Sequence, residues 1–134
     1  MAYEKRMIES PDGRVLEVAT IGDPSRPAVF FHHGTPGSAS LVRTIEELAT
    51  KGELFLVTMS RAGYGTSTRQ EGRDVAAAVP DTRTVLDALG IDRYAVVGWL
   101  VGWWTARAGL RGARRPPVRR RVVTRGCRTV HGRL

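Results

Sequence analysis

The chain has 134 residues, of which 42% are apolar and 25% charged, with a formal net charge of +8 and one cysteine. This length is enough for one domain with a buried core and argues against a second domain. The lone Cys127 excludes an internal disulfide, no Cys/His cluster has zinc spacing, and no apolar run is long enough to span a membrane or resembles a signal peptide. We expect a cytoplasmic protein that uses neither a metal nor a cofactor.

The first half of the chain predicts a hairpin, a buried strand and a helix. Residues 6–9 and 14–21 flank the Pro-Asp-Gly turn of "RMIESPDGRVLEVATIG", as in a β-hairpin. The continuous apolar run "AVFFHH" is typical of a strand buried on both faces, and the turn "GTPGS" follows it. Helical spacing within residues 40–52 places these apolar residues on one face: Leu41, Val42, Ile45, Leu48 and Ala49.

The second half continues the alternation of strand and helix. "ELFLVTMS" predicts another buried strand and precedes the polar loop "RAGYGTSTRQEG". "PDTRTVLDALG" predicts a helix with Pro80 near its start and Gly90 as its stop, and "YAVVGW" predicts a third buried strand. We therefore expect an α/β fold with a mostly parallel sheet, helices on both faces and an N-terminal hairpin.

The distribution of charged residues along the chain changes sharply near residue 100. Residues 1–99 hold all 13 acidic residues and 11 of the 21 basic ones, whereas the remaining 10 basic residues, all arginines, lie in residues 100–134. This arginine-rich tail has no clear helical or strand period, and it contains Pro116 and Pro117. We predict a domain part at residues 1–99 and a poorly ordered tail at residues 100–134 that is not native to the fold.

Three segments carry the candidate chemistry: "FFHHGTPGS", "SRAGYGTS" and "VVGW". Taken alone, the first could be a tight glycine turn, a phosphate-binding nest at a helix N-terminus or an oxyanion loop. Taken together, in this order and on this strand pattern, the three resemble the α/β-hydrolase family over residues 5–99.

This resemblance implies roles for particular residues. The backbone N–H of Thr35 is the implied oxyanion donor, and His33 and Gly34 shape its loop. "VVGW" resembles the strand that enters the nucleophile elbow G-x-S-x-G, which here reads Gly98, Trp99, Leu100, Val101 and Gly102. Leucine therefore occupies the nucleophile position. The implied parent activity is that of a serine hydrolase on a small-molecule ester, amide or related substrate.

A complete triad cannot be assembled from this sequence. A serine nucleophile needs a histidine and an acid, which in the family follow the serine, but no carboxylate side chain follows Asp92 and the only late histidine is His131. Ser60 and Ser67 lie in the loop after the second buried strand and are interpreted as turn residues. We expect a truncated hydrolase-family chain without activity of its own.

A frameshift explains why the charge break and the missing serine coincide. Gly98 to Arg111 can be encoded with a tandem CTGG, and deleting one copy makes the segment read GWSGGGPHALAC, which contains a serine elbow. GC-rich coding sequence read out of frame is also rich in arginine codons. We hypothesise an insertion near codon 100.

Two alternatives remain. The chain could be a small basic protein that binds nucleic acid or another polyanion non-specifically through its arginine tail, although Trp103 and Trp104 are clustered instead of interleaved with the charges. It could also be a ligand-binding module with a pocket but no nucleophile.

Overall fold

The computed structural model describes residues 3–40, 43–51 and 53–99. In chain order their elements are β1 (Tyr3–Glu9), β2 (Val15–Ile21), β3 (Ala28–His32), α1 (Arg43–Lys51), β4 (Phe55–Met59), α2 (Ala78–Ala88) and β5 (Tyr94–Gly98). Leu100, Val101 and Gly102 lie outside the described residues, as does the rest of the arginine tail. The division of the chain at residue 99 therefore stays a prediction.

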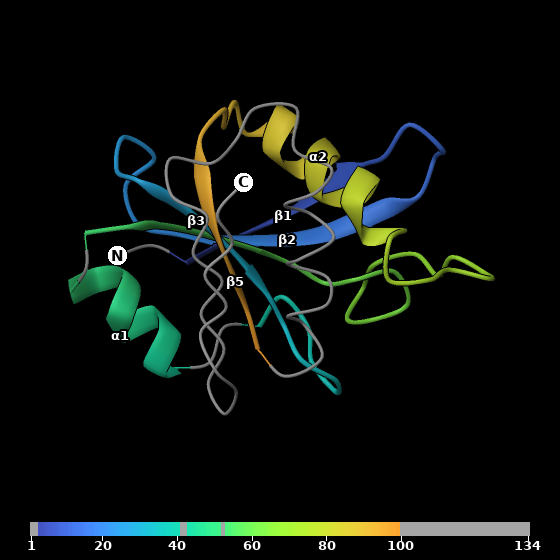
Figure 1. Cartoon of the computed structure of the whole chain (residues 1–134), viewed down its shortest axis with the longest axis horizontal. Helices are drawn as coiled ribbons and strands as arrows, with labels where there is room; N and C mark the ends of the chain where they lie inside the picture. The colour runs from blue at the N-terminus through green and yellow to red at the C-terminus, as the bar shows by residue number, and fades with distance from the viewer. Residues whose placement is uncertain (1–2, 41–42, 52, 100–134) are drawn as a thin grey trace, which may run out of the picture.

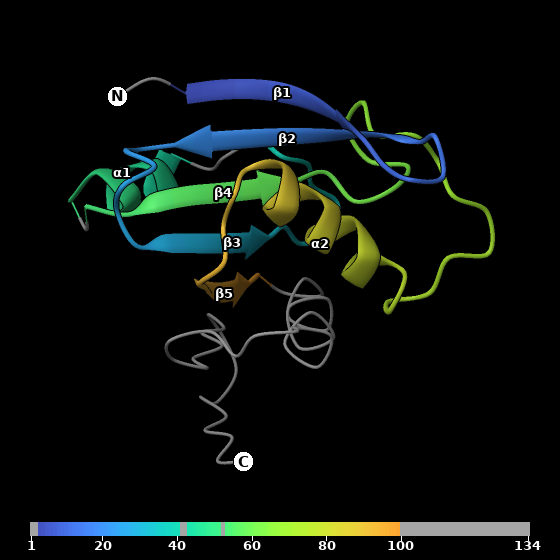
Figure 2. The same cartoon turned by 90° about the horizontal axis from the view of Figure 1, so that it is seen from above.

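The strands form one mixed sheet in the order β1-β2-β4-β3-β5, which Figure 2 shows from above. β2 pairs antiparallel with both β1 and β4, whereas β3 pairs parallel with β4 and with β5. The predicted α/β fold with an N-terminal hairpin is thereby confirmed.

The hairpin turn forms where the Pro-Asp-Gly sequence predicts it. The Ser10 N–H donates to the Arg14 carbonyl at 2.8 Å, and Gly13 adopts a φ of 82°, which glycine reaches without steric cost. The register pairs Glu9 with Val15 at the turn.

The two helices cover opposite faces of the sheet (Figure 1). Successive side chains of a strand point to opposite faces, so Phe30 packs in the core under α2 and Phe31 packs with Ala49 of α1. The larger cluster comprises Leu16, Val18, Phe30, Phe55, Val57, Met59, Val85, Leu86, Tyr94 and Val96. Burial on both faces is the reason that β3 and β4 read as continuous apolar runs.

The helix α2 begins at Ala78, two residues earlier than Pro80 would suggest. The Asp74 carboxylate accepts the Ala77 N–H at 2.9 Å, and the Val79 N–H donates to the Ala76 carbonyl at 3.0 Å. These bonds form the turn that leads into the helix. Pro80 then lies in the first helical turn, where a missing N–H costs no intrahelical bond.

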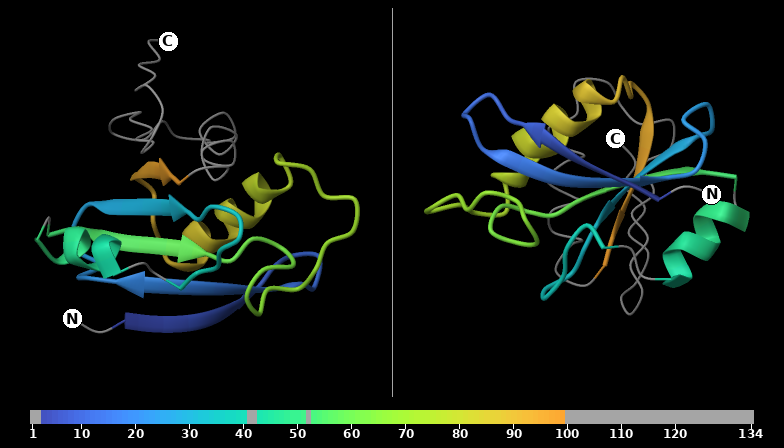
Figure 3. Two further views of the ribbon diagram at one scale, coloured as in Figure 1. Left: turned by 90° about the horizontal axis from the view of Figure 1, so that it is seen from below. Right: turned by 180° about the vertical axis from the view of Figure 1, so that it is seen from behind.

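The sheet brings the ends of three strands together. Because β3, β4 and β5 are parallel, their carboxyl ends at His32, Met59 and Gly98 meet at one edge. The loops that follow β3 and β4 lie side by side there (Figure 3). In the part of the chain that the structure describes, no helix has the length and apolarity needed to cross a membrane.

Candidate functional site

Strand β5 ends beside the loop that follows β3. His32 and Gly98 are register partners, and the Trp99 N–H donates to the His32 carbonyl at 3.0 Å. The pairing thus continues up to the last described residue of the elbow segment. Gly98 and Trp99 lie beside the first residues of the histidine-glycine loop, which we define as residues 33–37.

The His33 ring is held inside this loop by two hydrogen bonds. Its Nδ1 lies 2.7 Å from the Gly34 carbonyl, and its Nε2 accepts the backbone N–H of Arg61 at 3.1 Å. Since a carbonyl only accepts and an N–H only donates, the proton must lie on Nδ1 and the ring must be neutral. Burial, opposed by the Gly34 bond and assisted by the charges of Arg61 and Arg73, lowers the pKa of His33 to about 4.

The Arg61 guanidinium contacts the same loop from the other side. It donates to the carbonyl of His33, to the carbonyl of Gly34 at 3.2 Å and to the Thr35 hydroxyl at 2.8 Å. Arg61 is only 6% exposed, and its burial lowers its pKa. Sequence reasoning assigned no role to Arg61. A lone charged residue two positions after a buried strand is the signal that could have found it.

Tyr64 completes the surroundings of Thr35. Its hydroxyl lies 3.4 Å from the Thr35 hydroxyl, and its ring packs edge-on against His33. The guanidinium carbons of Arg61 and Arg73 lie 5.2 and 5.5 Å from its ring centroid. The Thr35 bond and these two positive charges lower the pKa of Tyr64.

A buried carboxylate, Glu17, organises the neighbouring loop. It accepts hydrogen bonds from Lys5 at 2.9 Å, from the Ser60 hydroxyl at 2.8 Å and from the Thr66 N–H at 3.0 Å. Burial alone would raise the pKa of Glu17, but these donors outweigh it and lower the pKa to about 2. The sequence signal for Glu17 is a single acid in the otherwise uncharged strand "VLEVATI".

The two serines of this loop are used within the fold. The Ser60 hydroxyl is fully buried, donates to Glu17 and accepts the Ala39 N–H at 2.6 Å. The Ser67 hydroxyl donates to the Ser60 carbonyl at 2.6 Å and accepts the Glu17 N–H at 2.9 Å. These partners agree with the interpretation of both serines as structural residues.

His32 is the least satisfied polar group near the site. It is 1% exposed, and neither ring nitrogen has a hydrogen-bond partner among the described residues. Burial, with the charges of Arg61 and His33, lowers its pKa to about 3. His32 is therefore neutral and packs against Phe30, with ring centroids 4.9 Å apart.

An open groove of about 640 Å³ lies beside the side chains of Tyr64 and Arg73. Its lining comes from the loop after β4: Ala62, Gly63, Tyr64, Arg69, Gln70, Glu71, Gly72, Arg73, Asp74 and Val75. Within residues 3–40, 43–51 and 53–99, no group of three or more His, Cys, Asp or Glu side chains is arranged to hold a metal ion.

No protein-family model and no curated protein matches this sequence. Among solved structures, the chain is similar to epoxide hydrolases from metagenomes of hot environments that are described as members of the α/β-hydrolase superfamily. The TM-score is 0.72, with 25% identity over 92% of this chain and 42% of that one. The chain has part of an α/β-hydrolase fold.

Two further structures share this α/β-hydrolase fold with the chain. A proline iminopeptidase-related protein from Thermus thermophilus is 26% identical, with a TM-score of 0.67 over 83% of this chain and 41% of that one. A CIB-like hydrolase from Thermoplasma acidophilum is 16% identical, with a TM-score of 0.75 over 92% of this chain and 62% of that one. The chain thus spans less than half the length of the T. thermophilus protein and is related to hydrolases by its fold.

Proposed function

We propose that this chain carries the N-terminal part of a serine hydrolase and that leucine at the nucleophile position leaves the sequence itself without hydrolytic activity. The pairing of β5 with β3 up to Trp99 supports this proposal, because it brings the end of β5 to the histidine-glycine loop. An oxyanion donor after one strand is useful when a nucleophile follows the neighbouring strand.

For the parent protein we propose hydrolysis of a small-molecule ester, amide or related substrate. A serine at position 100 would attack the carbonyl carbon and the alcohol or amine would leave, after which water would release the acyl group. The Thr35 N–H would hold the carbonyl oxygen while it carries negative charge. The similar structures described as epoxide hydrolases and as a proline iminopeptidase-related protein support the hydrolase class without selecting one substrate.

The structural roles of Ser60 and Ser67 support the absence of activity in the chain as it stands. Both hydroxyls are occupied by partners of the fold, and Ser60 contacts a carboxylate in place of a histidine. Among the residues that the structure describes, neither serine has the histidine partner that activates a nucleophile.

The coding DNA provides the decisive test. We expect a short duplication or another insertion near codons 99 and 100, and removing it should open a reading frame with a serine elbow followed by an acid and a histidine. The repaired protein should react covalently with a fluorophosphonate at residue 100, and the unrepaired chain should not. A clean reading frame through Leu100 with no open alternative would reject the frameshift, and labelling of Ser60 or Ser67 would reject the proposed inactivity.

A second proposal concerns the arginine tail. Residues 100–134 contain 10 arginines and no acid, so a native tail would bind polyanions such as nucleic acid without sequence preference. This function needs neither the sheet nor the histidine-glycine loop. It becomes the leading proposal if the reading frame proves intact.

A further inference from the structure

We propose that Arg61 is a positioning residue that holds the histidine-glycine loop in the one conformation in which the Thr35 N–H can act as an oxyanion donor. This inference rests on the proposed function, because it assigns Arg61 to the same oxyanion site. Its basis is the set of bonds between one guanidinium and three successive residues of the loop.

The hydrogen bonds found for the Arg61 guanidinium all go to the histidine-glycine loop. All three of its side-chain hydrogen bonds go to His33, Gly34 and Thr35, and no ion pair of Arg61 with a carboxylate is found in the described part of the chain. Burying a guanidinium is costly unless its donors are paired. The loop carbonyls therefore have to stay in place for Arg61 to remain buried, and Arg61 in turn holds the loop.

The backbone of Arg61 adds a second point of attachment. Its N–H donates to His33 Nε2, and the same ring reaches back to the Gly34 carbonyl through Nδ1. Gly37 closes the loop, because a Cβ there would lie 2.9 Å from His33 Nδ1 and 2.8 Å from the Gly34 carbonyl. His33 and Gly34, before Thr35, are thus held by hydrogen bonds, and Gly37, after it, packs closely against both.

Ser60, the residue before Arg61, anchors a different point. Its hydroxyl accepts the Ala39 N–H beyond the far end of the loop, and it is itself held by Glu17. Ser60 and Arg61, which follow β4, therefore bind the segment after β3 at two places. Of these two adjacent residues, Arg61 is the one that contacts Thr35, the residue that carries the proposed oxyanion donor.

The test is NMR relaxation on the full chain and its variants. In the wild-type chain the amides of Gly34 and Thr35 should have order parameters near ~0.85, the value of a rigid backbone, and in Arg61→Gln they should fall below ~0.6. Arg61→Lys keeps the charge but loses the planar fork of donors, so it should also loosen these amides.

The titration of the His33 ring is the second readout, because it shows whether a positive charge at residue 61 still lies beside the ring in each variant. Arg61 and Arg73 both lower the pKa of His33, and Glu17 raises it. Arg61→Gln should therefore raise the pKa of His33, whereas Arg61→Lys should leave it near the wild-type value.

Arg73→Gln is the matched control. Arg73 lies over the same Tyr64 ring and also lowers the pKa of His33, but none of the hydrogen bonds found for the loop comes from its side chain. Arg73→Gln should shift the titration without loosening Gly34 and Thr35. Equal loosening by Arg73→Gln, or rigid amides in both Arg61 variants, would overturn the proposal.

Thr35→Val keeps the test conclusive if Arg61→Gln fails to fold. It removes the 2.8 Å bond from Arg61 to the Thr35 hydroxyl, together with the 3.4 Å contact of the Tyr64 hydroxyl, and keeps the two bonds of the guanidinium to the loop carbonyls. The amide of residue 35 should lose order while Gly34 keeps it, and unchanged order at residue 35 would count against Arg61. Since this measurement reports loop order and not turnover, its failure would leave the fluorophosphonate test of the proposed function intact.

Discussion

The carboxylate of Glu17 shows how one buried charge can organise several loops. It receives donors from β1, from the end of β4 and from the following loop. Gly65 makes this approach possible, because it has a φ of 53° and because a Cβ there would overlap the carboxylate. Any side chain at residue 65 would displace Glu17 and with it Ser60.

The buried ionisable groups predict a loss of stability in acid. The pKa of His33 is lowered to about 4, so between pH 6.5 and 4 the unfolded chain binds a proton that the folded chain does not. This group therefore stabilises the folded chain at neutral pH, and the contribution is lost as pH falls through that window. His32 acts in the same direction. Urea unfolding at a series of pH values should show this decline, and constant stability from pH 7 to 4 would contradict it.

The variant Glu17→Gln distinguishes the contribution of the Glu17 carboxylate to the pH dependence of stability from that of the histidines. Glu17 has its pKa lowered to about 2, so its stabilisation is present above its unfolded value of 4.5 and is lost as pH falls toward 2. The variant should be less stable than wild type at pH 7, and the difference should shrink below pH 4.5. The decline between pH 6.5 and 4.5 should be the same in both proteins.

Leu100→Ser should not restore activity. The change supplies a hydroxyl, but no carboxylate side chain follows Asp92 in this sequence, and the arginine-rich residues still follow residue 102. Initial rates on activated acyl esters should equal those of the unchanged chain. Turnover above a heat-treated control would implicate an unrecognised base, and His131 would be the first residue to replace.

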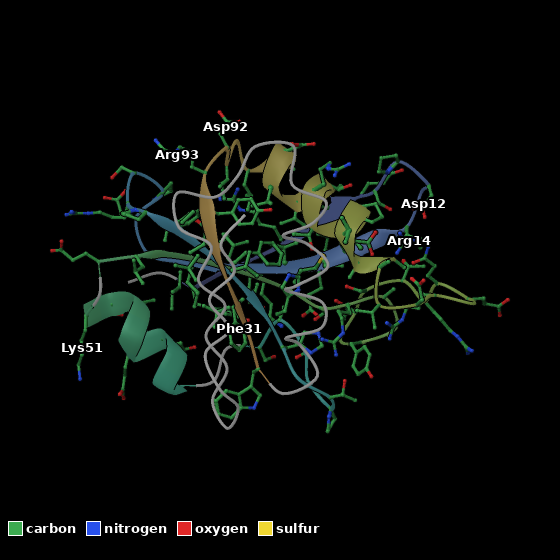
Figure 4. All side chains as sticks on the ribbon, viewed as in Figure 1. Asp12, Arg14, Phe31, Lys51, Asp92 and Arg93 are labelled. Carbon is green, nitrogen blue, oxygen red and sulfur yellow. The ribbon has the colours of Figure 1, made fainter. Side chains whose placement is uncertain are left out.

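The hairpin and α2 are joined by a buried ion pair. Arg14 donates to both carboxylate oxygens of Asp81, at 3.0 and 2.6 Å, and the two side chains are 11% and 3% exposed. Figure 4 shows Asp12 and Arg14 in the hairpin turn beside this helix. The pairing raises the pKa of Arg14 above its ordinary value. Elements far apart in the sequence are thereby fixed to each other at the same end of the molecule as the site.

Asp81→Asn should destabilise the fold strongly. Removing one partner leaves the other charge buried, which costs about 3 to 5 kcal/mol, with the lower value expected here because Asp12 still pairs with Arg14. Arg26→Gln is the matched control, since the Arg26–Glu53 pair is 48% and 69% exposed and such pairs contribute about 1 kcal/mol or less. Equal urea midpoints for the two variants would show that the Arg14–Asp81 pair does not join the elements as described.

The net positive charge of the whole molecule comes from residues 100–134. Residues 1–99 carry 11 basic and 13 acidic residues, so the excess positive charge belongs to the arginine tail. Binding of a fluorescent oligonucleotide should weaken steeply between 50 and 200 mM salt, by about a thousandfold if roughly six phosphates are contacted. A chain that ends at Trp99 should not bind. Equal affinity of the two chains would remove the tail from the explanation.

Much of the fold could be predicted because it depends on local patterns. The runs at β3, β4 and β5 identified the strands, and the Pro-Asp-Gly turn identified the hairpin. Pro80 lies near the start of α2, as the sequence predicts, and the helix begins two residues earlier, where the Asp74 side chain accepts the Ala77 N–H of the preceding turn. At the candidate site, motif spacing predicted an oxyanion loop of His33, Gly34 and Thr35, but it did not reveal the contacts of Arg61 and Glu17.

The sequence by itself determined the α/β class, the order His33-Gly34-Thr35 after a buried strand and the presence of leucine at residue 100, because each is a matter of residue type and order along the chain. Only the tertiary structure decided that Arg61 holds that loop and that Glu17 holds Ser60, because these partners are 26 to 28 and 43 residues apart and meet through the pairing of the sheet. It also decided the protonation of His33. A ring nitrogen becomes a donor or an acceptor according to the group placed against it, and that group is set by the fold.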